Sequence, residues 1–354
     1  MRLPSLIGFV LSGCAVLVGQ TYLDNLPLNH YLDGPLDNPV SRLAAGPIER
    51  LDLPGLLKKL DINPDSQVLA FARDSFQAAK ISPRNPRAIY FNDQVAVGMV
   101  PGGDEFEVAA ADPVRGVVFY TFDPTNQKFT RQEVCLKCHQ GPATLGVPGF
   151  FVGSVFPSFD GQPAKDGAII TDQRTAFADR WGGWFVNAAR GEQPDRANSV
   201  APDPAEPLTL EKLRVKLDTA KYLSPTSDIV ALMTLEHQTQ MTNYLTRLKW
   251  QAQVSDADVQ AAVDYMTFKD EVPLKEPIEG VSTFTRTFPL RGPLRDFDLK
   301  TRLFRYQVSY MIYSPQFAAL PEALQNRICE RIRQSVSADT LEILRDTTSF
   351  KAFR

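Results

Sequence analysis

Cysteine and histidine are scarce in this chain, and their scarcity limits the chemistry open to it. The 354 residues include four cysteines and three histidines, which are Cys14, Cys135, Cys138, Cys329, His30, His139 and His237. A disulfide-rich fold is excluded, because such folds place many cysteines in a short chain. A four-ligand zinc site is disfavoured, because it needs a second pair of closely spaced ligands and the chain has none.

A strong charge of either sign is also lacking. The chain has 38 Lys and Arg residues against 41 Asp and Glu residues, which gives a net charge of −3. No basic stripe is present, so we expect no nucleic-acid partner. The hydrophobic content of 44% and charged content of 22% are typical of a folded globular protein.

The N-terminus carries the pattern of an export signal. Arg2 precedes a mostly apolar run from residue 3 to residue 19, which is shorter than the ~20 apolar residues of a membrane-spanning helix. We expect residues 1–20 to be a signal peptide or a membrane or lipid anchor. Residues 11–14 resemble a lipoprotein processing box that would make Cys14 the acylated N-terminus, whereas cleavage near Gln20 and an uncleaved anchor remain alternatives.

One short motif contains three of these seven cysteine and histidine residues. Residues 135–139 read Cys-Leu-Lys-Cys-His, the pattern by which c-type haem is attached. In such a site, Cys135 and Cys138 would form thioethers with the haem vinyl groups, and His139 would bind the iron as its proximal ligand. Attachment of this kind takes place outside the bacterial cytoplasm, which agrees with an N-terminal export signal. A thiol redox pair is less favoured, since it usually lies at a strand-to-helix junction of a βαβ unit.

The remaining pattern predicts an α+β fold with an antiparallel, β-rich haem-attachment half and a mainly helical C-terminal half. We expect an extended N-terminal arm over 21–55, a β-rich domain carrying the motif over 56–200, and a helical region packed on it over 205–354. Short apolar runs separated by turn residues predict strands at 67–72, 88–91, 95–100, 106–108, 116–120, 150–155 and 184–186. Helical periodicity and capping residues predict helices at 228–250, 255–266, 296–313, 321–335 and 337–346.

Several segments resemble a functionally uncharacterised family of large exported bacterial cytochrome c domain proteins that carry a single haem motif. These segments are 86–93, 135–139, 145–149, 180–184, 223–238 and 294–298, within a likeness that spans most of 56–320. The resemblance implies haem binding and electron transfer. Relatives often carry a His-Met pair shortly after the segment that corresponds to 180–184, whereas this chain has Asp-Arg-Ala-Asn at 195–198.

The second axial position of the iron has several candidate ligands. Met233, His237 and Met241 follow one another at helical spacing and share one face of the predicted helix. His237 is the first candidate and Met241 the alternative, whereas His30 in the N-terminal arm fits a surface position better. A site with no protein ligand on this side is the third possibility, and it would permit chemistry on small ligands. A buried packing role is the ordinary alternative for each of these side chains.

Other residues are weaker candidates for the haem site. Arg180, and with it Arg174, could pair with the haem propionates, because a guanidinium group matches a carboxylate. The Nδ1–H of His139 needs an acceptor, and we expect a backbone carbonyl in Gly141-Pro142 or Val147-Pro148 to supply it.

The sequence thus predicts an exported protein with one covalent haem c. We expect it to transfer single electrons to or from a periplasmic partner protein, as a periplasmic protein or one anchored in the membrane and facing the periplasm. The alternative is a haem enzyme, such as a peroxidase-like oxidoreductase with an open distal site, in which His237 or Glu236 would act as acid or base.

Overall fold

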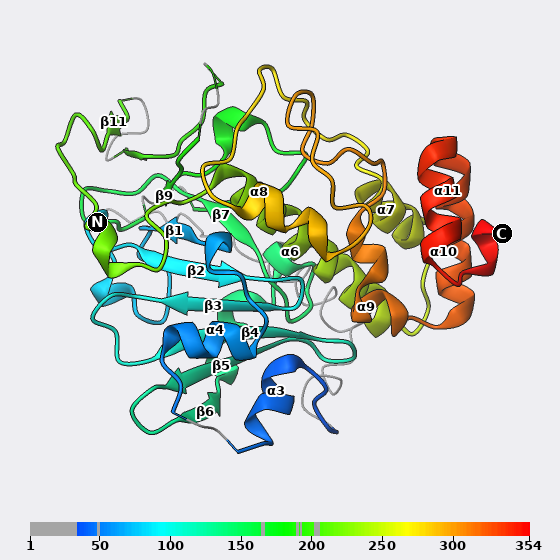
Figure 1. Ribbon diagram of the computed structural model, residues 1–354, viewed down its shortest axis with the longest axis horizontal. Helices are drawn as coiled ribbons and strands as arrows, with labels where there is room; N and C mark the ends of the chain where they lie inside the picture. The colour runs from blue at the N-terminus through cyan, green and yellow to red at the C-terminus, as the bar shows by residue number, and fades with distance from the viewer. Residues whose placement is uncertain (1–33, 48–49, 164–166, 189–190, 192, 202–205) are drawn as a thin grey trace, which may run out of the picture.

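A computed structural model describes residues 34–47, 50–163, 167–188, 191, 193–201 and 206–354 (Figure 1). The predicted leader over 1–20, including Cys14, lies outside the described residues, as does His30. Among the described residues, no helix combines the length and the apolar character that crossing a bilayer requires.

The β-rich half is built on one seven-stranded sheet in which every pair is antiparallel. The strand order is β6-β5-β4-β3-β2-β1-β9. Its strands are β1 Val68–Ala70, β2 Arg87–Phe91, β3 Val95–Met99, β4 Phe106–Asp112, β5 Gly116–Asp123, β6 Lys128–Arg131 and β9 Trp184–Phe185. Short turns join consecutive strands from β2 to β6, which is why the pairing is antiparallel. The smaller pairs are β7 Val152–Ser154 with β8 Ile169–Thr171, and β10 Ser199–Val200 with β11 Leu208–Thr209.

Different elements pack on the two faces of this sheet. One face carries Val97, Val108 and Phe122 and packs against helix α4. In Figure 1 this helix lies over β3 and β4. The opposite face turns toward helix α6, Ile229–Trp250, and the Cys-x-x-Cys-His motif. Side chains alternate along a strand. Gly98 of β3 therefore belongs to this second face, while its neighbours Val97 and Met99 lie on the face that packs against α4.

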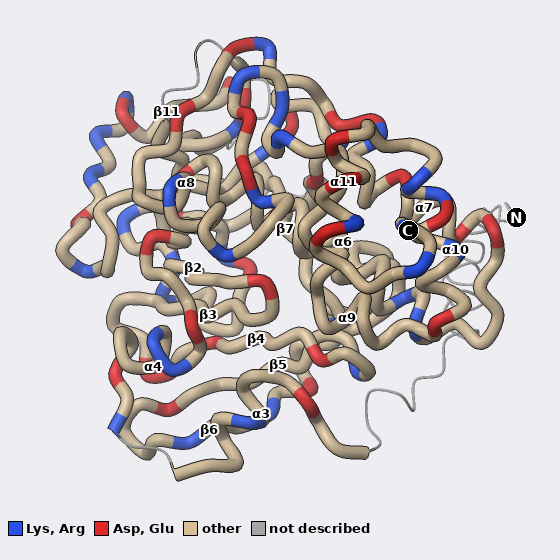
Figure 2. Tube along the Cα trace, turned by 45° about the vertical axis from the view of Figure 1, so that its right-hand side comes forward, with Lys and Arg blue, Asp and Glu red and all other residues tan. Residues whose placement is uncertain are grey.

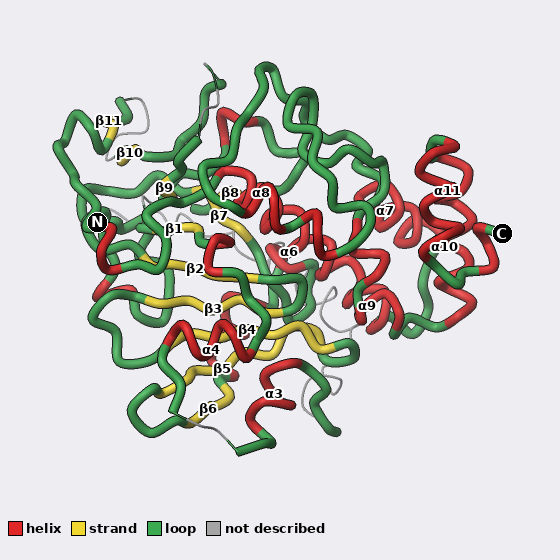
Figure 3. The backbone as a smooth tube through the Cα atoms, viewed as in Figure 1, coloured by secondary structure: helices red, strands yellow, loops and turns green. Residues whose placement is uncertain are grey.

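Helices dominate the second half of the chain, as Figure 3 shows by colour. The longer ones are α6 Ile229–Trp250, α7 Asp256–Met266, α10 Glu322–Ser335 and α11 Ala338–Thr347. The shorter ones there are α8 Phe284–Thr287 and α9 Pro315–Ala318, whereas α3 Pro39–Ala44, α4 Leu53–Lys59 and α5 Leu136–His139 belong to the first half. The predicted α+β class and the order of its two halves are therefore confirmed.

Helix α6 joins the two halves. Its N-terminus is capped by Asp228, whose carboxylate accepts hydrogen bonds from the backbone N–H of Val230 (2.7 Å) and Ala231 (3.3 Å). Nearly all of its 22 residues are buried. One hydrophobic core includes side chains of α6, β1, β2, α7 and α10, so the β-rich and helical parts share it. Burial on all sides is typical of a helix at the centre of a protein.

Two regions differ from the predictions. The helix predicted over 296–313 is wrong: this segment makes turns, and only a 3₁₀ turn at Tyr310–Tyr313 is helical. The Asp298 carboxylate accepts hydrogen bonds from the backbone N–H of Lys300 (2.8 Å) and Thr301 (2.6 Å), which stabilises a turn in competition with the helix. The described part of the predicted extended arm instead contains α3 and the start of α4.

Charged side chains of both signs are interspersed along the chain (Figure 2). Several form exposed ion pairs, including Arg327 with Asp256 at 2.6 Å and Lys80 with Asp104 at 2.7 Å. Most such exposed pairs add little stability, so the fold depends chiefly on its apolar cores.

Candidate functional site

A cavity of about 400 Å³ lies between the second face of the sheet and the residues around the Cys-x-x-Cys-His motif. Its size is within the ~300–1,000 Å³ that small-molecule and cofactor sites usually have. Ala96, Gly98 and Ala109 are small side chains on its sheet wall, on the neighbouring strands β3 and β4. Because these side chains reach little above the sheet, they leave room for a flat group there. Leu235 and Thr239 of α6 belong to the same cavity.

Both motif cysteines line this cavity. They lie on a 3₁₀ turn at Glu133–Cys135 that continues into the single-turn helix α5. The helical backbone places Cys135 and Cys138, three residues apart, on the same side of the turn. Cys138 is exposed and Cys135 half-buried, and neither forms a disulfide. Burial raises the pKa of the Cys135 thiol above its ordinary value. Two reduced thiols at the edge of a cavity are what thioether formation with a haem requires.

His139 follows them and is held in one orientation. Its Nδ1 lies 3.0 Å from the carbonyl oxygen of Gly149. Since a carbonyl only accepts, Nδ1 carries the proton and Nε2 keeps the lone pair that can bind a metal. No described residue is hydrogen-bonded to Nε2. The ring lies between Phe119, at 4.7 Å, and Phe151, at 4.9 Å between ring centroids. Burial lowers its pKa to about 4, so the imidazole is neutral at pH 7.

The loop after the motif fixes the Gly149 carbonyl. The backbone N–H of Gly149 donates to the His139 carbonyl at 2.9 Å, which closes the loop on itself. Asn243 of α6 donates from its side chain to the Phe150 carbonyl at 2.7 Å and accepts the Phe150 N–H at 3.1 Å. A Cβ at position 149 would come within 2.1 Å of the Asn243 side-chain oxygen, so only glycine fits. The predicted backbone acceptor is therefore found one residue beyond Val147-Pro148.

Charged side chains on the sheet wall form a compact group. Arg87 of β2 donates to Glu107 of β4 at 2.8 Å and lies 3.9 Å from Asp74. Burial opposes the charge on Arg87, but Glu107 and Asp74 outweigh it and raise the pKa of the guanidinium group. The sequence analysis missed Arg87 and Glu107. Their signal was a charged residue within an otherwise apolar strand, on the face shared with Ile89 and Ala109.

The structure places His237 away from this cavity. Its Nδ1 lies 2.5 Å from the Gln173 side-chain oxygen and its Nε2 lies 2.6 Å from the Ser309 hydroxyl. The ring is fully buried and stacks on Tyr265 at 5.4 Å. Leu235 and Thr239 face the cavity, and a residue between them in sequence projects from the other side of the helix. Both ring nitrogens are thus engaged outside the cavity, and this arrangement does not support the predicted role of His237 as an iron ligand.

Arg180 and Met241 also lie outside the cavity lining. Arg180 is buried and donates to the Thr175 carbonyl at 2.8 Å, the Gln173 carbonyl at 3.0 Å and the Glu236 carboxylate at 3.3 Å. Its guanidinium group is thus satisfied within the core and is not placed to pair with a haem propionate. Met241 packs in the core formed around α6.

Trp184, Trp181 and Arg174 divide between the cavity and its surroundings. Trp184 lines the cavity and donates from its indole N–H to the Gly153 carbonyl at 2.7 Å. Trp181 instead donates to Glu236 at 3.0 Å in the core. Arg174 pairs with Asp172 at 2.6 Å, outside the cavity lining.

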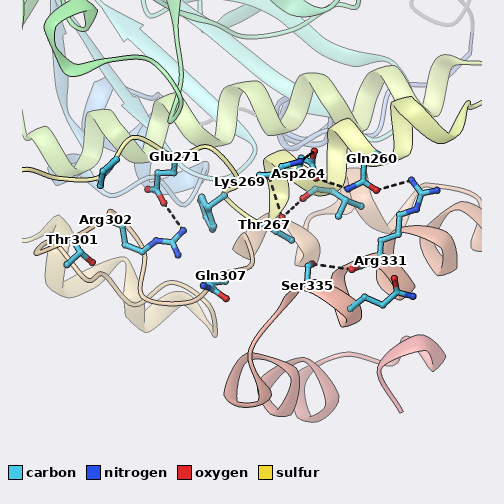
Figure 4. A pocket seen from close by; sticks show the side chains of 14 residues that line it. Gln260, Asp264, Thr267, Lys269, Glu271, Thr301, Arg302, Gln307, Arg331 and Ser335 are labelled. Atoms are coloured by element: carbon cyan, nitrogen blue, oxygen red, sulfur yellow. Dashed lines mark hydrogen bonds and ion pairs between the residues drawn. The ribbon is translucent and has the colours of Figure 1, made fainter.

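A second, larger hollow of about 700 Å³ lies between α7, α10 and the segments around residues 269 and 302 (Figure 4). It is polar, and its cations face carboxylates: Lys269 lies 2.8 Å from Asp264, and Arg302 lies 2.6 Å from Glu271. It shares no lining residue with the cavity beside the motif.

Comparison of the chain with protein-family models, with curated proteins and with solved structures gave no match.

Proposed function

We propose that the chain is an exported mono-haem c-type cytochrome that transfers single electrons. The observation that supports this most is the setting of His139. Its Nδ1–H is held by a backbone carbonyl, its Nε2 has no described hydrogen-bond partner, and two thiols lie beside it at the edge of a cavity. This combination is what a covalent haem needs from a protein, and a chance motif would have no reason to adjoin a cavity.

The residues present fit one haem. Cys135 and Cys138 would hold the macrocycle through thioethers, and His139 would bind the iron through Nε2. The apolar side chains of Ile89, Phe151 and Leu235 would contact its faces and edges and limit the access of water. When bound, the haem supplies one-electron redox chemistry.

The chain's own residues then act on the iron indirectly. The Gly149 carbonyl fixes the tautomer and orientation of the His139 ring, and the hydrogen bond makes the imidazole a stronger donor. Phe119 and Phe151 contact the ring and restrain it. Asn243 holds the segment that carries the carbonyl. A rigid proximal side lowers the reorganisation that accompanies a change of iron charge.

The cellular setting follows from the chemistry of attachment. Thioether formation outside the bacterial cytoplasm and the N-terminal export pattern both favour a periplasmic protein, or one anchored in the membrane and facing the periplasm. Its partner would be a periplasmic electron donor or acceptor protein. Cys138 is exposed, so an edge of a haem bound there would lie near the surface, where such a partner could approach.

A second candidate function is an oxidoreductase with an open distal site. The observation in its favour is that His139 is the one histidine in the described lining of the cavity, which contains no methionine. The two candidates share the haem and differ in what occupies the sixth position of the iron.

The proposal is tested with full-length protein exported from cells that mature c-type cytochromes. The visible spectrum is recorded in the ferric state and after reduction, followed by a redox titration. We expect the absorption bands of a c-type haem, one haem per chain in the pyridine haemochrome assay, and a reversible one-electron titration. Protein without haem from such cells would refute the proposal, and haem without a reversible titration would refute the electron-transfer role.

A further inference from the structure

Helix α6 holds the loop that follows the motif through two side chains one helical turn apart. Asn243 brackets Phe150: its Nδ2 donates to the Phe150 carbonyl at 2.7 Å, and its Oδ1 accepts the Phe150 N–H at 3.1 Å. Arg247, four residues further along the same face of the helix, donates to the Leu145 carbonyl at 3.1 Å. These two anchors flank Gly149 in the sequence, so α6 fixes the backbone on both sides of the carbonyl that orients the motif histidine.

A single peptide group joins Asn243 to His139. The carbonyl of Gly149 accepts the His139 Nδ1–H at 3.0 Å. The N–H of the same peptide group belongs to Phe150, and it donates to Asn243 Oδ1 at 3.1 Å. Because a peptide group is planar and rigid, fixing its N–H also fixes its C=O. Hydrogen bonds at the two ends of one peptide group also polarise each other, so Asn243 makes the carbonyl a stronger acceptor for the histidine.

The surroundings of Asn243 allow its amide only one orientation. The side chain is fully buried, and its Nδ2 also donates to the Gln240 side-chain oxygen at 2.8 Å. A flipped amide would turn its oxygen toward the Gln240 oxygen and the Phe150 carbonyl, which only accept, and would leave the Phe150 N–H without an acceptor. The oxygen of Asn243 is therefore held against the peptide group that His139 uses.

We infer that Asn243 is a positioning residue that lowers the reduction potential of the haem, acting through the Gly149–Phe150 peptide group and His139. The role rests on the proposed function, since a reduction potential requires the haem. A firmly held acceptor draws the Nδ1–H toward itself and makes the imidazole a stronger donor to the iron. A stronger donor favours the ferric state, which carries the larger positive charge, so the potential is lower with Asn243 than without it.

The experiment is a redox titration of the full-length protein and its variants, after haem content has been measured. In Asn243→Ala the equilibrium constant for reduction should rise about twofold to tenfold, the effect of weakening one hydrogen bond. This corresponds to a shift of about 20–60 mV to higher potential. Asn243→Ser, whose hydroxyl can still accept one hydrogen bond, should shift the potential less. In both variants the His139 Nδ1–H should exchange with deuterium faster than in wild type, which NMR measures directly.

Asn198 provides a matched control, because it brackets Val186 in the same way. Its side chain accepts the Val186 N–H at 2.9 Å and donates to the Val186 carbonyl at 2.7 Å. Neither residue lines the cavity beside the motif. Asn198→Ala therefore reproduces the general cost of losing such a bracket, measured by urea denaturation, and it should leave the potential unchanged. An equal shift of potential in Asn198→Ala and Asn243→Ala would show that a loosened fold is sufficient and would overturn the role of Asn243.

The remaining outcomes separate the role of Asn243 from the function on which it rests. Protein without haem, in wild type as in the variants, would refute the proposed function itself. A haem protein whose potential is unchanged or lower in Asn243→Ala would overturn the role of Asn243 and leave the cytochrome intact. If Asn243→Ala does not fold, Asn243→Ser decides in its place: a wild-type potential together with wild-type exchange of the His139 Nδ1–H would contradict the role.

Discussion

Two histidines with opposite surroundings distinguish the region around the Cys-x-x-Cys-His motif from the core around α6. His139 has one nitrogen fixed by the Gly149 carbonyl, while its other nitrogen has no described partner beside a cavity. His237 has both nitrogens engaged, by Gln173 and Ser309, and is sealed among aromatic rings. The difference makes His139, which has one nitrogen without a described hydrogen bond, a better candidate for a metal ligand than His237.

The same contrast extends to the charges near each histidine. In the core around His237, Arg180 makes three hydrogen bonds and pairs with the buried Glu236. On the cavity wall, Arg87 is paired but keeps an Nε–H without a described partner. Arg180 and Glu236 are thus paired within the core, whereas Arg87 and its carboxylate partners line a cavity.

The largest expected effect concerns the cysteines. Cys135→Ala combined with Cys138→Ala should abolish covalent haem, because no thiol remains to form a thioether. Haem staining of a denaturing gel measures this directly. Cys329 is the control, since it is buried in α10. Cys329→Ala should retain a full haem signal, and a stained double variant would place the attachment elsewhere.

Replacing each of the two histidines in turn gives the next largest effect. His139→Ala should change the visible spectrum, because the iron loses its proximal ligand. His237→Gln should leave the spectrum of the bound haem unchanged but lower the free energy of unfolding by about 1–3 kcal/mol, since Gln173 and Ser309 lose a well-placed partner. Spectra and urea denaturation of both variants test the comparison. A spectral change in His237→Gln without loss of stability would reverse the two roles.

Two glycines in the loop after the motif test how the orientation of His139 is fixed. A methyl group at position 149 would overlap the Asn243 side chain, so Gly149→Ala should cost about 1–3 kcal/mol and disturb the hydrogen bond to His139. A methyl group at position 141 meets no atom within 4 Å, so Gly141→Ala should stay within about 1 kcal/mol of wild type. Denaturation curves of the two variants distinguish them. Equal stability of the two variants would mean that the loop accommodates the added methyl group at position 149 without loss of stability.

The smallest effect is a pH dependence. Burial, with a contribution from Arg302, lowers the pKa of His237 to about 3, whereas an unfolded histidine titrates near 6.5. The unfolded chain therefore binds the extra proton first, and the free energy of unfolding falls as the pH drops from about 6.5 toward 3. The slope from this residue is at most about 1.4 kcal/mol per pH unit. His237→Gln removes this titrating group, so its stability between pH 7 and pH 5 should change less than that of wild type by about 1–2 kcal/mol. An equal pH dependence of stability in His237→Gln and in wild type would contradict a buried, neutral His237.

Much of the architecture could be predicted from local patterns. Alternating apolar strands separated by turn residues predict most of the sheet, and the capping position at Asp228 predicts α6 almost to the residue. The segment at 296–313 could not be predicted, because its apolar spacing resembles a helix while the turn is set by the Asp298 carboxylate. Local hydrogen bonding there outweighs periodicity.

The candidate site shows the same limit. Cys135, Cys138 and His139 follow from a contiguous motif, which needs no knowledge of tertiary contacts. His237 was misplaced because helical spacing indicates a shared face but does not reveal which face meets the cavity. Arg87 and Glu107 were missed because their proximity depends on the register of strands that are 20 residues apart in the chain.

The most direct test of the central claim is the mass of the intact exported chain under denaturing conditions, followed by peptide mapping. The account predicts one chain carrying the mass of one haem, located on the peptide that contains Cys135 and Cys138. A bare polypeptide mass, from cells that attach haem to a known c-type cytochrome, would contradict it.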